Sequence, residues 1–151
     1  MKLTTQEKKL IQRSFLVLNQ SNKSFATCFY DCLFELAPLI KPMFKSERRI
    51  FEQHFHELIS TAVNKIENFD DIQPILLKLG QKHKEYGVKK EQFGIVKTAL
   101  ILSVQYQLKS GSNSAIEQAW SNYYDQIAEV MIEGLSEQAT SPNTAAPGDN
   151  S

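Results

Sequence analysis

His83 is the residue of this sequence whose type and position raise the first question about chemistry. It lies in "KLGQKHKEYGVKKEQF", residues 78–93, on the apolar side of a helical segment that Gly87 ends. A histidine near a helix C-terminus can interact favourably with the helix dipole, or it can be a partly buried structural side chain. A lone histidine in such a place is more often structural than functional. The segment alone leaves these interpretations open.

Two aromatic residues raise a similar question. Tyr30 falls in the middle of a helical pattern among apolar neighbours, where its hydroxyl needs a hydrogen-bond partner. Phe44 closes "IKPMF", a corner that contains a proline. Both can be core aromatics, as most aromatic residues at helical spacing are. That interpretation does not say what the Tyr30 hydroxyl bonds to.

The cysteines offer less chemistry. Cys28 and Cys32 are the only two, and their spacing puts them on one face of a helix. Two ligands are too few for a structural zinc site, and a secreted disulfide scaffold has more cysteines in a shorter chain. We expect two reduced thiols, at least one of them packed as a small hydrophobic side chain.

The composition predicts one globular domain. The chain has 151 residues, of which 42% are hydrophobic and 23% charged, and no apolar run approaches the roughly 18 residues that cross a bilayer. The 17 basic residues balance the 17 acidic ones, which gives no electrostatic reason to expect a nucleic acid or an acidic membrane as partner. "MKLTTQEKKL" lacks the apolar core of a signal peptide, so we expect a cytoplasmic protein.

The elements that must position these residues are all helical, because apolar residues recur every three or four positions. Thr4 and Glu7 form a capping box at the first helix, and "NQSNKS" breaks it. The second helix starts near Phe25 and must end near Ala37, since Pro38 follows. The two prolines of "PLIKPMFKS" predict a short helical turn and a corner.

The second half of the chain continues the pattern. Ser46 is the expected N-cap of a long helix that runs to about Ile66, and Pro74 fits the first turn of the helix that carries His83. A further helix spans about 90–108, "KSGSNS" connects it to the last helix, and the sequence from 138 to 151 has nothing to bury. We predict an all-α domain of six or seven helices over residues 1–137, and a disordered polar tail over 138–151.

With these elements in place, the sequence resembles the globin family, in particular its bacterial single-domain and flavohaemoglobin-like branch. The matching stretches are "FYDCLFELAPLIKPMF", "AVNKIENF", "LGQKHKEYGV" and "AWSNYYDQIAEVMI", in the family's order and spacing, within about residues 4–134. The resemblance implies the globin fold, a three-over-three helical sandwich around haem b, iron protoporphyrin IX.

On the proximal side, the resemblance makes His83 the ligand of the haem iron. Its other ring nitrogen would donate to a backbone carbonyl of the same helix, which we expect at Leu79. Phe44 matches the aromatic residue that packs flat against the haem. The rest of the apolar wall would come from Leu76, Leu79, Val88, Phe93, Val96 and Leu100.

On the distal side, Tyr30 matches the tyrosine that points at the iron-bound ligand in this branch, so we expect its hydroxyl to donate to that ligand. Phe51 falls where many globins place a distal histidine or glutamine, and Phe55 lies one turn later, also over the haem. His54, on the shoulder between them, could bind the iron reversibly as a sixth ligand, or could face solvent or a propionate. If the helix is irregular, Gln53 could turn inward instead.

The sequence departs from the flavohaemoglobins, which pair the proximal histidine with a tyrosine and a glutamate. Phe93 and Leu135 stand at those positions, and neither can hydrogen-bond His83. The leading expectation is reversible binding of O₂, NO or CO, for storage, scavenging or sensing. The alternatives are nitric oxide dioxygenation or nitrite reduction with an external reductase, and a haem-free regulatory module.

Overall fold

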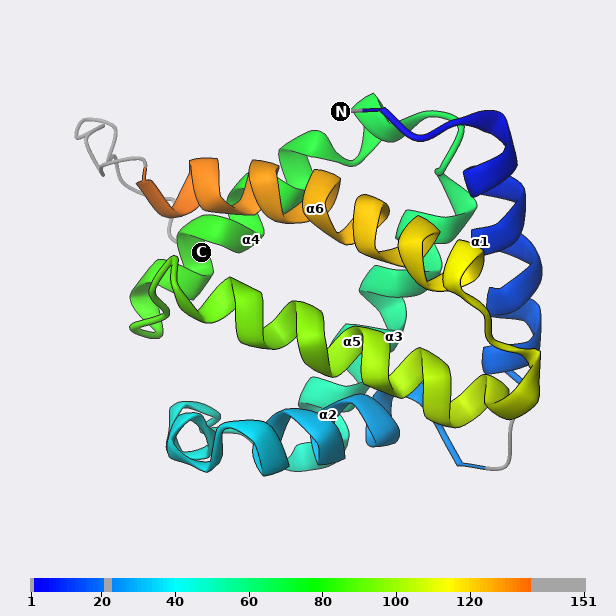
Figure 1. The fold of residues 1–151 in the computed structure, drawn as a ribbon. Helices are drawn as coiled ribbons and strands as arrows, with labels where there is room; N and C mark the ends of the chain where they lie inside the picture. Colours follow the sequence, from blue (N-terminus) through cyan, green and yellow to red (C-terminus); the bar gives the residue numbers. More distant parts are fainter. Residues whose placement is uncertain (1, 21–22, 137–151) are drawn as a thin grey trace.

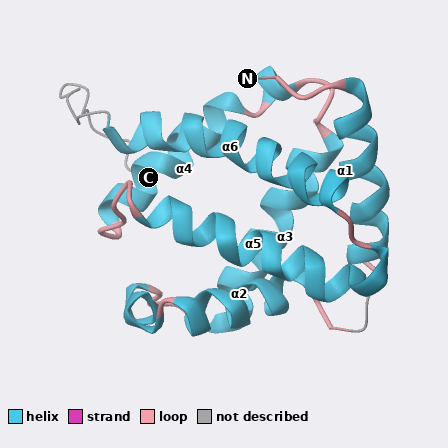
Figure 2. Cartoon of the chain, viewed as in Figure 1, coloured by secondary structure: helices cyan, strands magenta, loops and turns pink. Residues whose placement is uncertain are grey.

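The computed structural model describes residues 2–20 and 23–136, which fold into helices and connecting turns (Figure 2). The α-helices of this part are α1 (Thr5–Leu18), α2 (Phe25–Leu36), α3 (Arg48–Asn64), α4 (Gln73–Glu85), α5 (Gln92–Leu108) and α6 (Ser114–Ser136). Three short 3-10 helices, η1 (Pro38–Met43), η2 (Phe69–Asp71) and η3 (Lys109–Gly111), lie between them. The all-α prediction is therefore confirmed. Residue 137 and the predicted tail, residues 138–151, lie outside the described residues.

Most helix ends follow from local chemistry. The capping box is present, since the Thr4 side chain accepts from the Glu7 N–H and the Glu7 side chain accepts from the Thr4 N–H. Pro38 stops α2 at Leu36 and begins η1. The prediction of Ser46 as N-cap is wrong, because the N-cap is Glu47, whose carbonyl accepts the first helical hydrogen bonds of α3 from the Ile50 and Phe51 N–H groups. A serine at the N-cap is worth only about 1 kcal/mol, which does not dictate where a packed helix begins.

The helices pack in pairs around the core. Helix α4 lies against α6, and α2 lies against α5 (Figure 1). Helix α3 packs on α2 and α1, and in the described chain it hardly touches α4. Helices α3 and α4 are therefore both held by other elements, and each can present apolar side chains to something besides its neighbour.

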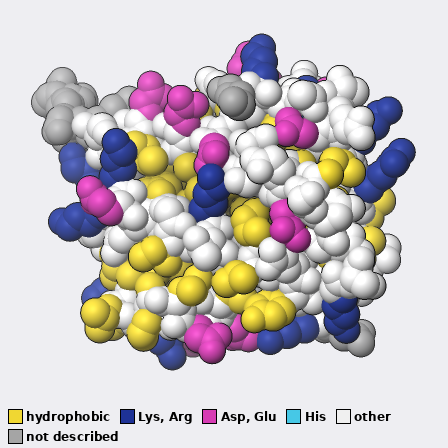
Figure 3. Space-filling model, viewed as in Figure 1, with side chains coloured by type: hydrophobic (Ala, Val, Ile, Leu, Met, Phe, Trp, Pro, Cys, Tyr) yellow, Lys and Arg dark blue, Asp and Glu magenta, His cyan; other side chains and the backbone are white. Residues whose placement is uncertain are grey.

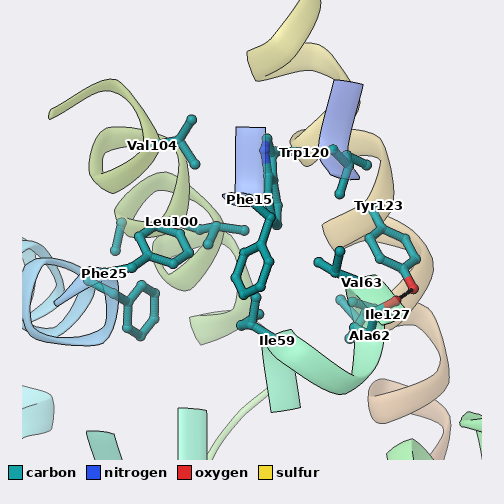
Figure 4. Packing of buried hydrophobic residues seen from close by; sticks show 14 of the residues in the cluster. Phe15, Phe25, Ile59, Ala62, Val63, Leu100, Val104, Trp120, Tyr123 and Ile127 are labelled. Atoms are coloured by element: carbon teal, nitrogen blue, oxygen red, sulfur yellow. Dashed lines mark hydrogen bonds between the residues drawn. The ribbon is translucent and has the colours of Figure 1, made fainter. Parts of the chain in front are cut away.

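Two buried hydrogen bonds tie the last helix to the others. Trp120 Nε1 donates to Ser14 Oγ at 2.9 Å, which joins α6 to α1. The Tyr123 hydroxyl donates to the Ala62 carbonyl at 2.6 Å, which joins α6 to α3 (Figure 4). Both donors lie among fully packed apolar side chains, where an unpaired polar group would be costly. The first bond fixes α1 on α6, and the second fixes the C-terminal part of α3 on α6.

The surface carries interspersed charges. Acidic and basic side chains are scattered over the face drawn in Figure 3, with apolar side chains between them. In the described part of the chain, no helix combines the length and apolar character needed to span a bilayer.

Candidate functional site

The end of α4 holds His83 in one orientation. Its Nδ1 donates to the Leu79 carbonyl at 2.7 Å, the contact expected from the sequence. A carbonyl can only accept, so the proton lies on Nδ1 and the lone pair on Nε2. Burial lowers the pKa of His83, and the bond to the carbonyl opposes that shift. The imidazole is therefore neutral at pH 7 with Nε2 free to bind a metal.

The chain turns sharply after this histidine. Gly87 has φ +87°, a backbone conformation that residues with a side chain rarely adopt. The Val88 N–H donates to the His83 carbonyl at 3.0 Å. The turn brings the chain back toward α5, where the Phe93 ring lies 6.5 Å from the His83 ring between centroids. The Tyr124 hydroxyl donates to the Phe93 carbonyl at 2.7 Å and anchors the start of α5 to α6.

Two glycines set the position of α4, and the sequence analysis missed them. A Cβ at Gly80 would collide with the Met131 carbonyl, and a Cβ at Gly134 would collide with the Leu77 carbonyl. The two helices thus approach backbone to backbone, one turn before His83. The signal in the sequence is a glycine inside each of two helical patterns, but one sequence does not reveal that the two meet.

Tyr30 lies in a cage of aromatic rings from α2, from α3 and from Phe44, which directly follows η1. Its ring lies 4.7 Å from Phe51, 5.6 Å from Phe44 and 5.8 Å from Phe55, centroid to centroid, all in edge-to-face geometry. Only 8% of the residue is exposed, and burial raises the pKa of its hydroxyl. The hydroxyl is therefore protonated at pH 7 and can donate a hydrogen bond.

The Tyr30 hydroxyl and His83 Nε2 both border accessible space. Neither atom has a hydrogen-bond partner among the described residues, whereas every sealed side-chain nitrogen or oxygen atom there has one. Both atoms must therefore lie at an opening and not inside the packed core. The Tyr30 hydroxyl can donate a hydrogen bond, and the lone pair of His83 Nε2 is of the kind that can bind a metal.

The remaining predicted wall residues divide into two groups. Leu76, Phe93 and Leu100 belong to the buried core. A second group is only half buried although its members are apolar, and it comes from both sides of the site: Phe44, Phe51, Phe55, Leu79, Val88 and Val96. Large apolar side chains that the protein covers only in part are suited to an apolar, flat group between α3 and α4.

Two predicted distal residues are not brought to Tyr30. His54 and Gln53 are both exposed, and Gln53 Nε2 donates to Glu57 one turn further along α3 at 3.1 Å. Helix α3 is an uninterrupted α-helix, so the irregularity that would turn Gln53 inward is not found. His56, also exposed, lies 3.5 Å from the Ser60 hydroxyl. Cys28 and Cys32 are free, buried thiols, as expected.

These residues fit haem. An apolar wall from two sides, a neutral imidazole with a free Nε2 and a hydroxyl donor with no partner in the described chain are the groups that a haem and its gas ligand need. His83 would hold the iron, and Phe44, Phe51 and Phe55 would contact the porphyrin.

Comparison with known proteins agrees with this fit. The family model described as Globin matches residues 27–131. Neuroglobin-1 of Oncorhynchus mykiss is 29% identical over 147 residues, which cover 88% of this chain and 92% of that protein. A bacterial globin of Campylobacter jejuni is 25% identical with a TM-score of 0.73, and the match covers 87% of this chain and 96% of that one.

A third similarity concerns the fold alone. An engineered carbene transferase from Rhodothermus marinus has a TM-score of 0.81 at 19% identity, with 97% of this chain and all of that chain covered. Because the family model spans well over half of the sequence and the helices are arranged as in these structures, the chain belongs to the globin family and is a haem-binding, gas-ligand-binding globin.

Proposed function

We propose that this globin holds haem b between α3 and α4, with His83 Nε2 as the protein ligand of the iron. The observation that carries the proposal is the 2.7 Å hydrogen bond from His83 Nδ1 to the Leu79 carbonyl, which fixes the tautomer and aims Nε2. Bound haem supplies an iron that binds diatomic gases reversibly. The protein contributes the imidazole, the apolar wall that excludes water, and the donor on the opposite side.

Tyr30 is that donor. Its hydroxyl is protonated, has no partner in the described chain and borders accessible space. It would therefore donate to a diatomic ligand that carries negative charge, which favours O₂ over CO. Reversible O₂ binding, for storage, scavenging or sensing, is the function that this arrangement supports best. A cytoplasmic location stays a prediction.

The proximal side favours reversible binding over a dedicated nitric oxide dioxygenase. Phe93 lies against His83 where a hydrogen-bonding tyrosine would be needed, and a backbone carbonyl is the one hydrogen-bond acceptor that the described residues give to the His83 imidazole. A carbonyl donates less electron density through the imidazole than a carboxylate does.

The absorption spectrum of the haem-loaded protein tests the proposal. We expect a Soret band after expression or after addition of haemin, and its loss or a large shift in His83→Ala. His56→Ala, an exposed histidine of α3, is the matched control and should leave the spectrum unchanged. A parent chain that takes up no haemin, or a spectrum identical in His83→Ala, would contradict the proposal.

The same spectra test His54 as a sixth iron ligand, which stays a prediction from the sequence. Its side chain is exposed on α3, so it would have to turn inward to reach the iron. A low-spin deoxy ferrous spectrum that becomes high-spin in His54→Ala would support this role. A parent spectrum that is already high-spin would exclude it.

A further inference from the structure

A cluster of hydrogen-bonded polar residues joins α2 to α3 near the aromatic cage. On α2, Thr27 and Asp31 precede and follow Tyr30 in the sequence, and on α3, Arg48 and Glu52 precede and follow Phe51. We call these four residues the distal clamp. The Tyr30 and Phe51 rings, whose centroids lie 4.7 Å apart, come from the same two helices.

Arg48 is the centre of the distal clamp. Its Nε donates to Glu52 at 2.6 Å, and its Nη2 donates both to Asp31 at 2.7 Å and to the Thr27 carbonyl at 3.0 Å. The Thr27 hydroxyl in turn donates to Glu52 at 2.7 Å. Three of these four bonds join α2 to α3, so one guanidinium fixes the first turn of α3 on α2.

The clamp is coupled to the aromatic cage by packing and by charge. The Arg48 guanidinium lies 5.8 Å from the centre of the Phe34 ring, which itself lies 5.8 Å from Tyr30 and 6.2 Å from Phe51 between centroids. The charges of Glu52 and Arg48 also act on the Tyr30 hydroxyl, in opposite directions. A change in the clamp therefore reaches the Tyr30 side chain without touching the proximal side.

Arg49 shows that this arrangement is particular to Arg48. Its ion pair with Glu47, at 3.1 Å, involves two side chains that are 79% and 71% exposed. The side chains of Arg48 and Glu52 are less exposed, at 39% and 18%, and Asp31 is 45% exposed. Exposed ion pairs contribute little to stability, whereas a partly covered fork with several acceptors can fix a geometry.

We propose that Arg48 is a positioning residue for the gas-ligand site, which keeps the Tyr30 hydroxyl aimed at the ligand by clamping α3 to α2. This inference rests on the haem site proposed above. It goes beyond that proposal because it assigns a role to a residue that is neither the proposed iron ligand nor part of the apolar wall. Loosening the clamp should let Phe51 and Tyr30 take other positions and weaken the hydrogen bond to a bound ligand.

The test compares haem-loaded parent, Arg48→Met and Arg49→Met. Methionine keeps an apolar side chain next to Phe34 but removes the guanidinium and its hydrogen bonds to Glu52, Asp31 and Thr27. We expect Arg48→Met to release O₂ about two- to fivefold faster, the range of a modest ion-pair energy, and Arg49→Met to match the parent. The infrared stretching band of the CO complex should shift to higher frequency in Arg48→Met alone, because Tyr30 then donates less to the ligand.

A double-mutant cycle separates positioning from general loosening. In the Tyr30→Phe background, Arg48→Met should no longer change O₂ release, since the donor through which it acts is gone. Glu52→Gln keeps the size of the side chain and should reproduce part of the faster O₂ release of Arg48→Met. The inference can therefore be tested even if the Arg48→Met protein folds poorly.

Two results would overturn the inference. One is O₂ release from both Arg48→Met and Glu52→Gln at the parent rate, and the other is an equal effect of Arg48→Met with and without Tyr30. If the parent binds haem and either result is found, this inference is wrong but the proposed function is not affected. A parent that binds no haem overturns the proposed function and this inference together.

Discussion

At the scale of single residues, Tyr30 is the polar group whose surroundings explain most about the site. A tyrosine among five aromatic rings would ordinarily direct its hydroxyl to a carbonyl, as Tyr123 and Tyr124 both do. Tyr30 has no such partner in the described chain. Among these three buried or half-buried tyrosines, Tyr30 alone keeps a hydroxyl that can donate to a bound ligand, which is the role proposed for it.

Tyr30→Phe should therefore accelerate O₂ release while the fold is kept. A hydrogen bond to a charged acceptor contributes about 1.5–3 kcal/mol, which corresponds to roughly 10- to 150-fold in the dissociation rate. Stopped-flow replacement of O₂ by CO measures this rate. Tyr106→Phe, at an exposed tyrosine, is the control and should match the parent. A change within about twofold in Tyr30→Phe would refute the role of Tyr30.

His83 should make the stability of the haem-free protein depend on pH. Its pKa is lowered in the folded state, so below the ordinary value of about 6.5 the unfolded chain takes up a proton before the folded chain does. The stabilisation that this group retains at pH 7.5 is thus lost as the pH falls from about 6.5 toward the folded-state pKa. Urea unfolding between pH 7.5 and pH 5 should show a smaller decrease for His83→Gln than for the parent. Equal slopes would mean that His83 titrates normally.

At the scale of helices, the close crossing of α4 and α6 determines the position of His83. Gly80 and Gly134 let two backbones approach where a Cβ on either would collide with a carbonyl of the other helix. Neither contact is with a flexible side-chain end, so the clash cannot be relieved by a rotamer change. The crossing must open for any larger residue.

Gly80→Ala and Gly134→Ala should each destabilise the protein by about 1–3 kcal/mol, the usual cost of overpacking. Gly80→Ala should also weaken haem binding, because it shifts the helix that carries His83. Gly94→Ala is the matched control: nothing lies within 4 Å of a Cβ there, and the site is inside α5. Alanine should be neutral or stabilising at that position. Chemical denaturation of the three variants measures their free energies of unfolding. A Gly80→Ala protein as stable as the parent would show that α4 can move at little cost.

The helices themselves were largely predictable from the sequence, and their crossings were not. The capping box of Thr4, the stop before Pro38 and the turn at Gly87 are local signals that act within a few residues. The start of α3 was misplaced because a cap preference is weak beside packing. The Gly80–Gly134 approach and the clamp around Arg48 join segments far apart in the chain, for which spacing carries no signal.

At the scale of the molecule, the proposed haem site lies between two helices, α3 and α4, that scarcely contact each other. Helix α3 is fixed on α2 and α1, α4 is fixed on α6, and the two hardly touch in the described chain. The resemblance to globins supplied the roles of His83 and Tyr30, since no local pattern links residues 53 positions apart. What the structure added is that each of the two reactive atoms borders accessible space.

Haem should therefore act as a bridge between two halves of the fold. A group that binds the folded state alone stabilises it by mass action, about 2.7 kcal/mol at a hundredfold excess over its dissociation constant. Haem contacts on Phe51 and Phe55 of α3 and on Leu79 and His83 of α4 would add to that stability where helix–helix packing is thinnest. We expect haem to slow hydrogen exchange most in residues 48–58 and 76–88, and much less in α1, which packs on α6, α5 and α3 and contributes no residue to the proposed site. Hydrogen exchange followed by mass spectrometry, with and without haemin, measures this difference directly. Equal protection of α1 and of the two site segments would mean that haem stabilises the fold as a whole and does not bridge α3 and α4.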